Sequence, residues 1–170
     1  MTRSTLSQEK TVHVVWLLLL SAGIVAADRW TKWLAATRIA PGRHHVVIPR
    51  VFAISHVENP GAAFGLFINS PSPDRARWLL LGFSLLAAAA FFLLLLRLGK
   101  RITATTVALA LILGGAVGNA YDRMRFGFVM DFIEVHIVRY HYPDFNIADS
   151  AIVVGGILLF LDALLSKPEA

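Results

Sequence analysis

Two carboxylates, Asp131 and Asp149, are the residues of this 170-residue sequence that are best suited to do chemistry. They lie on either side of the point where the chain enters its last apolar segment, so their side chains could converge at one boundary of that segment. Two neighbouring carboxylates cannot both ionise cheaply, and they therefore share a proton near neutral pH. One member of such a pair can activate a water molecule while the other protonates the opposing oxygen, which is a route to amide hydrolysis.

Amide and cationic side chains accompany this pair. Asn119, Asp122 and Arg123 are spaced i, i+3 and i+4, so the three share one face of a helix, and Asn146 is likewise three residues before Asp149. We expect Asn119 and Asn146 to orient the two carboxylates. We expect Arg123 to bind a peptide carbonyl or a lipid headgroup oxygen.

Simpler roles stay open for several polar residues. Asp122 with Arg123, and Asp28 with Lys32, could each form an ordinary ion pair at the end of a helix. The tripeptide Asn59-Pro60-Gly61 is, taken alone, typical of a turn. Spacing alone therefore makes a hydrolytic site possible and does not establish it.

The elements that must position these residues are membrane spans. The chain is 56% hydrophobic and 16% charged, with a mean hydropathy of +0.64, whereas soluble domains are about 45–50% apolar and about 25% charged. Four apolar segments approach the roughly 20 residues that a helix needs to cross a bilayer. The sequence predicts one integral membrane domain over 1–170, an all-α bundle of four transmembrane helices, with spans near 11–28, 78–97, 102–121 and 145–165.

Basic residues predict how these spans are oriented. Six of the 16 Lys and Arg residues fall in three very short segments: the N-terminal tail, the turn 97–101 and the C-terminal tail. The other ten are spread over the two longer connections, 29–77 and 122–144. This density favours cytoplasmic termini and outer connections. A signal peptide cleaved after Ala27 is an alternative for the first span, but its apolar run is longer than usual, and we favour a retained helix.

The two outer connections contain extended, β-branched runs. Residues 45–54 and 129–138 both have this character, so we expect a small extracytoplasmic sheet or hairpin. Within the third span, Gly114, Gly115 and Gly118 form a small-residue pattern, as Ala151 and Gly155 do in the fourth, and we expect these residues to serve helix packing.

Several kinds of site and partner are not expected. The absence of cysteine excludes thiolate metal sites and a cysteine nucleophile. The six histidines have no paired ligand spacing on a helix, so we expect no zinc site and no cofactor. The basic residues are scattered between apolar blocks, which argues against a nucleic-acid partner. Asp144, a third acidic group near the pair, is expected to be solvated.

Five short motifs follow one another along the chain, in register with the four spans. They are Asp28-Arg29-Trp30-Thr31-Lys32, Asn59-Pro60-Gly61-Ala62-Ala63-Phe64, the run from Gly114 to Arg123, Val129-Met130-Asp131-Phe132-Ile133, and Phe145-Asn146-Ile147-Ala148-Asp149-Ser150. Together they resemble the motifs of bacterial lipoprotein signal peptidase (signal peptidase II), a membrane aspartic peptidase, and the resemblance extends from about residue 12 to 165.

The resemblance implies roles for the residues in these motifs. Asp131 and Asp149 match the catalytic aspartates. Positions lining the site would be Asn59, Gly61, Asn119, Arg123 and Asn146, and structural support would come from Asp28, Lys32 and Asp122. It also implies a short surface helix near Pro71 to Arg77.

The implied activity is that of an endopeptidase in the bacterial inner membrane. It would remove signal peptides from prolipoproteins whose cysteine already carries diacylglycerol, cleaving immediately before that cysteine near the outer face. Substrate and membrane lipid are the expected partners, and the chain is expected to act as a monomer. A proton-coupled transporter subunit is the alternative, because carboxylates inside membranes also relay protons. Such a protein would hold them near the midplane and often shows an internal repeat, whereas here the polar groups cluster at one boundary.

Overall fold

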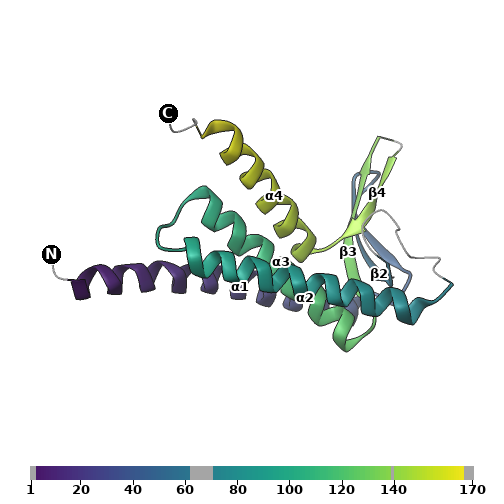
Figure 1. The fold of residues 1–170 in the computed structure, drawn as a ribbon. Coiled ribbons are helices and arrows are strands. Elements are labelled where there is room, and N and C mark those ends of the chain that lie inside the picture. The colour runs from purple at the N-terminus through teal and green to yellow at the C-terminus, as the bar shows by residue number, and fades with distance from the viewer. Residues whose placement is uncertain (1–2, 62–70, 139, 167–170) are drawn as a thin grey trace.

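The computed structural model describes residues 3–61, 71–138 and 140–166, which form four helices and a small sheet (Figure 1). The helices are α1 (Arg3–Arg38), α2 (Pro73–Leu98), α3 (Ala104–Arg125) and α4 (Ile147–Leu165). Each contains a stretch long and apolar enough to cross a membrane. The sequence-based expectation of a membrane protein built on four apolar helices is therefore confirmed.

Helix α3 is the centre of the bundle. It packs against α1, α2 and α4, and 67% of its most apolar stretch is buried, compared with 11–17% in the other three helices. The outer surfaces of α1, α2 and α4 consequently expose many large apolar side chains. Because water would disfavour such a surface, these faces are suited to contact lipid.

Glycines allow α3 to approach its neighbours closely. A Cβ atom at Gly115 would lie 2.3 Å from the Ala148 carbonyl oxygen, and one at Gly155 would lie 2.6 Å from Ile112 Cγ1. Close backbone approach at small residues is a common way to join helices in membranes. The packing role predicted for these glycines agrees with this geometry.

Two helices begin or end elsewhere than the sequence predicted. Helix α1 continues ten residues beyond the expected span, because no glycine or proline interrupts 29–38; the chain turns only at Pro41-Gly42, where Gly42 has φ of +72°. The short surface helix predicted near Pro71 to Arg77 is wrong for the described residues. The backbone from Pro73 onward is the first turn of α2, because proline is favoured in the first turn of a helix and nothing breaks the helix afterwards.

A four-stranded antiparallel sheet lies at one end of the bundle. Its strands are β1 (His44–Ile48), β2 (Phe52–Asn59), β3 (Val129–Ile137) and β4 (Tyr140–Phe145), in the order β1-β2-β3-β4. The expected small sheet is therefore present, and both extended runs contribute to it. Figure 1 shows the N- and C-terminal ends of the chain at the opposite end of the bundle from this sheet.

Candidate active site

Asp131 lies in β3 and is almost completely buried, with 2% of its surface exposed. Its two carboxylate oxygens accept hydrogen bonds from two amides. Asn59, the last residue of β2, donates through Nδ2 to Oδ2 at 3.0 Å, and Asn146 donates through Nδ2 to Oδ1 at 2.7 Å. The pairing of β2 with β3 brings Asn59 beside Asp131, since Val57 is the register partner of Asp131.

Asp149 lies in the first turn of α4 and forms a reciprocal capping box with Asn146. The Asp149 backbone N–H donates to Asn146 Oδ1 at 2.9 Å, and the Asn146 backbone N–H donates to Asp149 Oδ2 at 3.3 Å. The other carboxylate oxygen, Oδ1, accepts a hydrogen bond of 2.7 Å from Asn119 Nδ2 on α3. The same capping box therefore starts α4 and orients the Asp149 carboxylate.

Asn146 connects the two carboxylates. It is fully buried, and its side chain donates to Asp131 while its backbone and side-chain oxygen pair with Asp149. Its amide nitrogen also lies 3.4 Å from Asn119 Oδ1 and 3.3 Å from the Met130 carbonyl oxygen. The structure therefore brings Asp131, Asp149, Asn119 and Asn146 together around one buried amide.

Burial makes the Asp131 carboxyl a weaker acid than an ordinary aspartate. Removal of this carboxyl from water raises its pKa to about 7, and the neighbouring negative charge of Asp149 acts in the same direction. The hydrogen bonds from Asn59 and Asn146 act in the opposite direction and only partly offset this rise. A carboxyl group with this pKa can hold or release a proton at neutral pH, as an acid–base catalyst must.

Arg123 borders the same region from α3. Its Nη2 donates to the Gly61 carbonyl oxygen at 3.2 Å and its Nη1 to Ser84 Oγ at 3.4 Å. The Gly61 backbone N–H donates to Asn59 Oδ1 at 3.0 Å, which fixes the turn predicted for this tripeptide. The buried Nε of Arg123 has no hydrogen-bond partner among the residues that the structure describes. Arg123 therefore places a positive charge within electrostatic reach of Asp131 and Asp149, and its Nε is a donor unused by the described part of the chain.

A buried ionic cluster contacts the segments that carry the two carboxylates. It consists of Lys32, Asp28 and Asp122. Lys32 Nζ is 2.8 Å from Asp28 Oδ2 and 2.8 Å from Asp122 Oδ2, and all three side chains are at most 1% exposed. Asp28 also accepts the Ala148 backbone N–H at 3.0 Å. Asp122 accepts the Met130 backbone N–H at 3.3 Å. These contacts tie α1 and α3 to the segments that carry the two carboxylates.

The pairings inside this cluster differ from two simpler interpretations of the sequence. Asp28 and Lys32 do form an i, i+4 pair, but they lie buried inside α1 and not at its end. Asp122 pairs with Lys32 and Arg29, and not with Arg123. The role of Arg29 was missed, and only its place in the first motif could have indicated it.

Asp144 is not solvated as the sequence suggested. Its side chain is only 8% exposed, it accepts a hydrogen bond from Ser55 Oγ, and its Oδ1 is 3.0 Å from His141 Nε2. The sheet explains this burial. Strands β2 and β4 flank β3, and this arrangement brings Ser55 of β2 and Asp144 of β4 together. The histidines were also judged by helical spacing, whereas His136 and His141 are brought together by strand pairing.

Comparison with known proteins identifies the family. The family model described as signal peptidase (SPase) II matches residues 20–165. A lipoprotein signal peptidase of Solibacter usitatus is 44% identical over 153 residues, covering 89% of this chain and 92% of the relative. A lipoprotein signal peptidase of Pseudomonas syringae pv. tomato is 40% identical, covering 96% and 94%. The alternative of a transporter subunit receives no support from these matches.

Solved structures agree with the sequence relatives. Two structures described as bacterial membrane enzymes match with TM-scores of 0.76 and 0.72, at 31% and 32% identity. The first match covers 91% of this chain and 93% of the solved chain, and the second covers 89% and 94%. Together with the four membrane-length helices, these findings indicate a multi-pass protein of the bacterial inner membrane. The chain therefore belongs to the signal peptidase II family.

Proposed function

We propose that Asp131 and Asp149 are the catalytic pair with which this peptidase hydrolyses its substrate. The observation that carries the proposal is the contact of one buried residue, Asn146, with both carboxylates. Its side-chain amide donates to Asp131 and its backbone N–H donates to Asp149, so one residue holds an oxygen of each acid in position. All of these groups come from one chain, so a monomer is expected to suffice.

The surroundings of the two acids suggest a division of labour. Asp131, whose pKa is raised to about 7 by burial, can carry a proton at neutral pH. Asp149 lies in the first turn of α4, where its carboxylate accepts the hydrogen bond of the Asn119 amide. Asp149 is therefore the general base and Asp131 the general acid of the first step.

Hydrolysis then follows from proton transfers between these groups. Asp149 removes a proton from water, the oxygen attacks the scissile carbonyl carbon, and Asp131 protonates the carbonyl oxygen, which gives a neutral tetrahedral intermediate. As this intermediate collapses, Asp149 delivers its proton to the leaving amine. Asp131 recovers its proton from the hydroxyl group as the carbonyl of the new carboxylic acid forms. Both residues end in their starting states.

The substrate class that fits this site is a prolipoprotein whose cysteine carries diacylglycerol, cleaved immediately before that cysteine. The apolar side chains that α2 and α4 expose are suited to contact lipid, and α4 also carries Asp149 in its first turn. Acyl chains can remain in lipid there while the peptide reaches the polar groups. Anchoring the substrate in the membrane would hold the scissile bond near the acids and lower the entropic cost of reaction.

The proposed orientation has cytoplasmic termini and a site near the outer face. The sheet, whose strand β3 carries Asp131, and the start of α4, which carries Asp149, lie at the end of the bundle opposite both termini (Figure 1). The turn between α2 and α3, with Arg97, Lys100 and Arg101, lies at the same end as the termini. Concentrated basic residues favour the cytoplasmic side.

A matched pair of substrates tests this function. Purified full-length protein in proteoliposomes is given a prolipoprotein that carries diacylglyceryl cysteine, and separately the same precursor with an unmodified cysteine. We expect cleavage of the modified precursor alone, with mass spectrometry finding the lipidated cysteine as the new N-terminal residue. Equal cleavage of both precursors would contradict the substrate class, and no cleavage of the modified precursor would contradict the function.

A further inference from the structure

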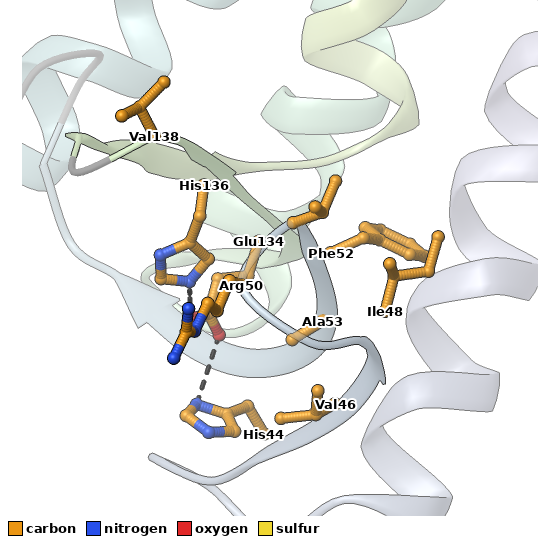
Figure 2. Close-up of a pocket in the computed structure, with 10 residues that line it drawn as sticks. His44, Val46, Ile48, Arg50, Phe52, Ala53, Glu134, His136 and Val138 are labelled. Carbon is orange, nitrogen blue, oxygen red and sulfur yellow. Dashed lines mark hydrogen bonds and ion pairs between the residues drawn. The ribbon is translucent and has the colours of Figure 1, made fainter.

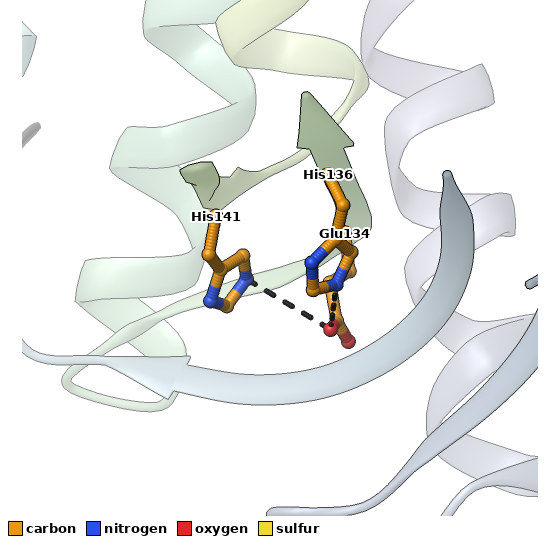
Figure 3. A group of neighbouring side chains, drawn as sticks. All are labelled: Glu134, His136 and His141. Carbon is orange, nitrogen blue, oxygen red and sulfur yellow. Dashed lines mark hydrogen bonds and ion pairs between the residues drawn. The ribbon is translucent and has the colours of Figure 1, made fainter. Parts of the chain in front are cut away.

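A cluster of one carboxylate and two imidazoles lies on the sheet, apart from the paired acids. Glu134 and His136 are two residues apart in β3, so both side chains point to the same face of the strand. His141 on β4 is the register partner of His136, which places their rings side by side, stacked at 4.8 Å between centroids and 7° from parallel. Figure 3 shows both imidazoles directed at the Glu134 carboxylate.

The spacing of the three ligand atoms suits a metal ion. Nε2 of His136 lies 2.7 Å from Glu134 Oε1, and Nε2 of His141 lies 3.9 Å from the same oxygen. One ligand atom from each residue falls within 4.8 Å of the others. Tetrahedral ligands at the usual zinc distances of about 2.0–2.1 Å are about 3.3 Å apart, which lies between the two measured distances. Small side-chain rotations would complete the geometry.

Further contacts hold these ligands in position. Glu134 is a buried carboxylate, with its side chain 8% exposed, and its second oxygen, Oε2, lies 3.2 Å from His44 Nδ1 on β1. The contact of His44 with the second oxygen of Glu134 is of the kind that orients metal ligands in known sites. Asp144 Oδ1 lies 3.0 Å from His141 Nε2, the nitrogen that would bind the ion, so a bound ion would replace this contact.

The cluster opens onto a hollow of about 340 Å³. His44, Arg50, Glu134 and His136 are among the residues that line it (Figure 2). The hollow gives an ion access from solvent. The positive charge of Arg50 opposes the entry of a cation, so Arg50 would lower affinity without contributing a ligand.

We propose that Glu134, His136 and His141 bind a divalent transition-metal ion, for which Zn²⁺ is the reference ion. Imidazole nitrogens with a carboxylate oxygen suit zinc and its transition-metal neighbours, whereas Mg²⁺ and Ca²⁺ prefer oxygen ligands alone. The bound ion would hold β3 and β4 together at the outer sheet. It has no part in the hydrolysis proposed above. The competing explanation is that the imidazoles only neutralise a buried glutamate, and it predicts no metal binding.

Calorimetric titration of the full chain tests the proposal. The protein is purified in detergent on a tag without histidine, stripped of metal, and titrated with ZnCl₂ or MgCl₂. We expect one Zn²⁺ per chain, no comparable binding of Mg²⁺, and affinity reduced about tenfold or more in Glu134→Gln, His136→Ala and His141→Ala. Failure of wild type to bind Zn²⁺, or equally tight Mg²⁺ binding, would overturn the site.

Two further variants keep this test specific. His45→Ala removes an exposed histidine on β1 that lies outside the cluster, and zinc affinity should not change. A loss equal to that of His136→Ala would overturn the site. Arg50→Ala should strengthen zinc binding several-fold because it removes an opposing charge, and weaker binding would contradict the assigned position.

Thermal unfolding separates lost ligands from lost folding. Zinc should raise the unfolding temperature of wild type and of His45→Ala, because a ligand bound only by the folded state stabilises that state. It should not raise the unfolding temperature of His136→Ala or His141→Ala. A cooperative unfolding transition of these two variants without zinc is the control that they are folded. An equal zinc-dependent increase in the ligand variants would contradict the proposal.

Discussion

The side-chain amide of Asn146 donates a 2.7 Å hydrogen bond to Asp131, an acid on a different element of the fold. The same residue is the N-cap of α4, so the start of a helix and the position of a buried carboxylate depend on one side chain. This double use allows its two roles to be separated by substitution.

Asn146→Ser should keep the helix cap and lose the amide donor to Asp131. Serine is among the preferred N-cap residues, so we expect α4 to keep its start, with stability lowered by about 1–3 kcal/mol for the lost amide hydrogen bonds and peptidase activity reduced about tenfold or more. Asn146→Ala should lose the same activity and about 1 kcal/mol of further stability. Unfolding temperature and turnover are the measurements. Wild-type turnover in Asn146→Ser would show that the contact with Asp131 does not matter for activity.

Asp131→Asn should change how stability depends on pH. Burial raises the pKa of Asp131 to about 7, above its unfolded value of about 3.9, so the folded protein binds more protons than the unfolded chain between these values. The stability from this group is fully present below about pH 4 and is lost as the pH rises to about 7. The variant cannot ionise at this position.

The unfolding temperature of Asp131→Asn relative to wild type should therefore be higher at pH 8 than at pH 5. Glu58→Gln, which replaces an exposed acid on β2, is the control and should show no such trend. A difference between Asp131→Asn and wild type that stays constant from pH 5 to pH 8 would contradict the raised pKa.

Lys32→Met should destabilise the fold strongly. The change leaves Asp28 and Asp122 as buried carboxylates that have lost their shared cation, and breaking a buried ion pair costs about 3–5 kcal/mol. Lys100→Met removes an exposed lysine and is the matched control. If Lys32→Met unfolds at the wild-type temperature, the ionic cluster does not support the site.

Gly115→Ala should disrupt the contact between α3 and α4. The added Cβ would lie 2.3 Å from the Ala148 carbonyl oxygen, and overpacking of this kind costs about 1–3 kcal/mol. Gly156→Ala on α4 meets nothing within 4 Å and should leave stability nearly unchanged. Equal unfolding temperatures of the two variants would show that the helices can move apart at no cost.

Local patterns in the sequence predicted the parts of the structure that depend on neighbouring residues. Apolar length located four helices, and i, i+3 and i+4 spacing placed Asn119 and Arg123 on α3. The family motifs selected Asn59 and Asn146, whose amides both contact Asp131. Spacing along the chain could not have found the Asn59 contact, because it depends on strand pairing.

Contacts that depend on strand register were missed for this reason. The histidines were compared with helical metal motifs, but His136 and His141 meet as cross-strand partners. Asp144 was judged by its neighbours in sequence, yet Ser55 reaches it from another strand. Register between distant strands is set by the turns and bulges of the whole sheet, and one sequence read locally does not contain it.

The most direct test of the central claim is the rate at which Asp131→Asn and Asp149→Asn process a diacylglyceryl-modified prolipoprotein, measured by gel shift. Asp162→Asn, which changes an acid at the far end of the helix that carries Asp149, is the matched control. The proposed acid–base mechanism predicts that Asp131→Asn and Asp149→Asn each remain folded and lose about 10²–10⁴-fold in rate. Asp162→Asn should retain activity. Processing by either dyad variant within a few-fold of the wild-type rate would contradict the assignment of Asp131 and Asp149 as the catalytic pair.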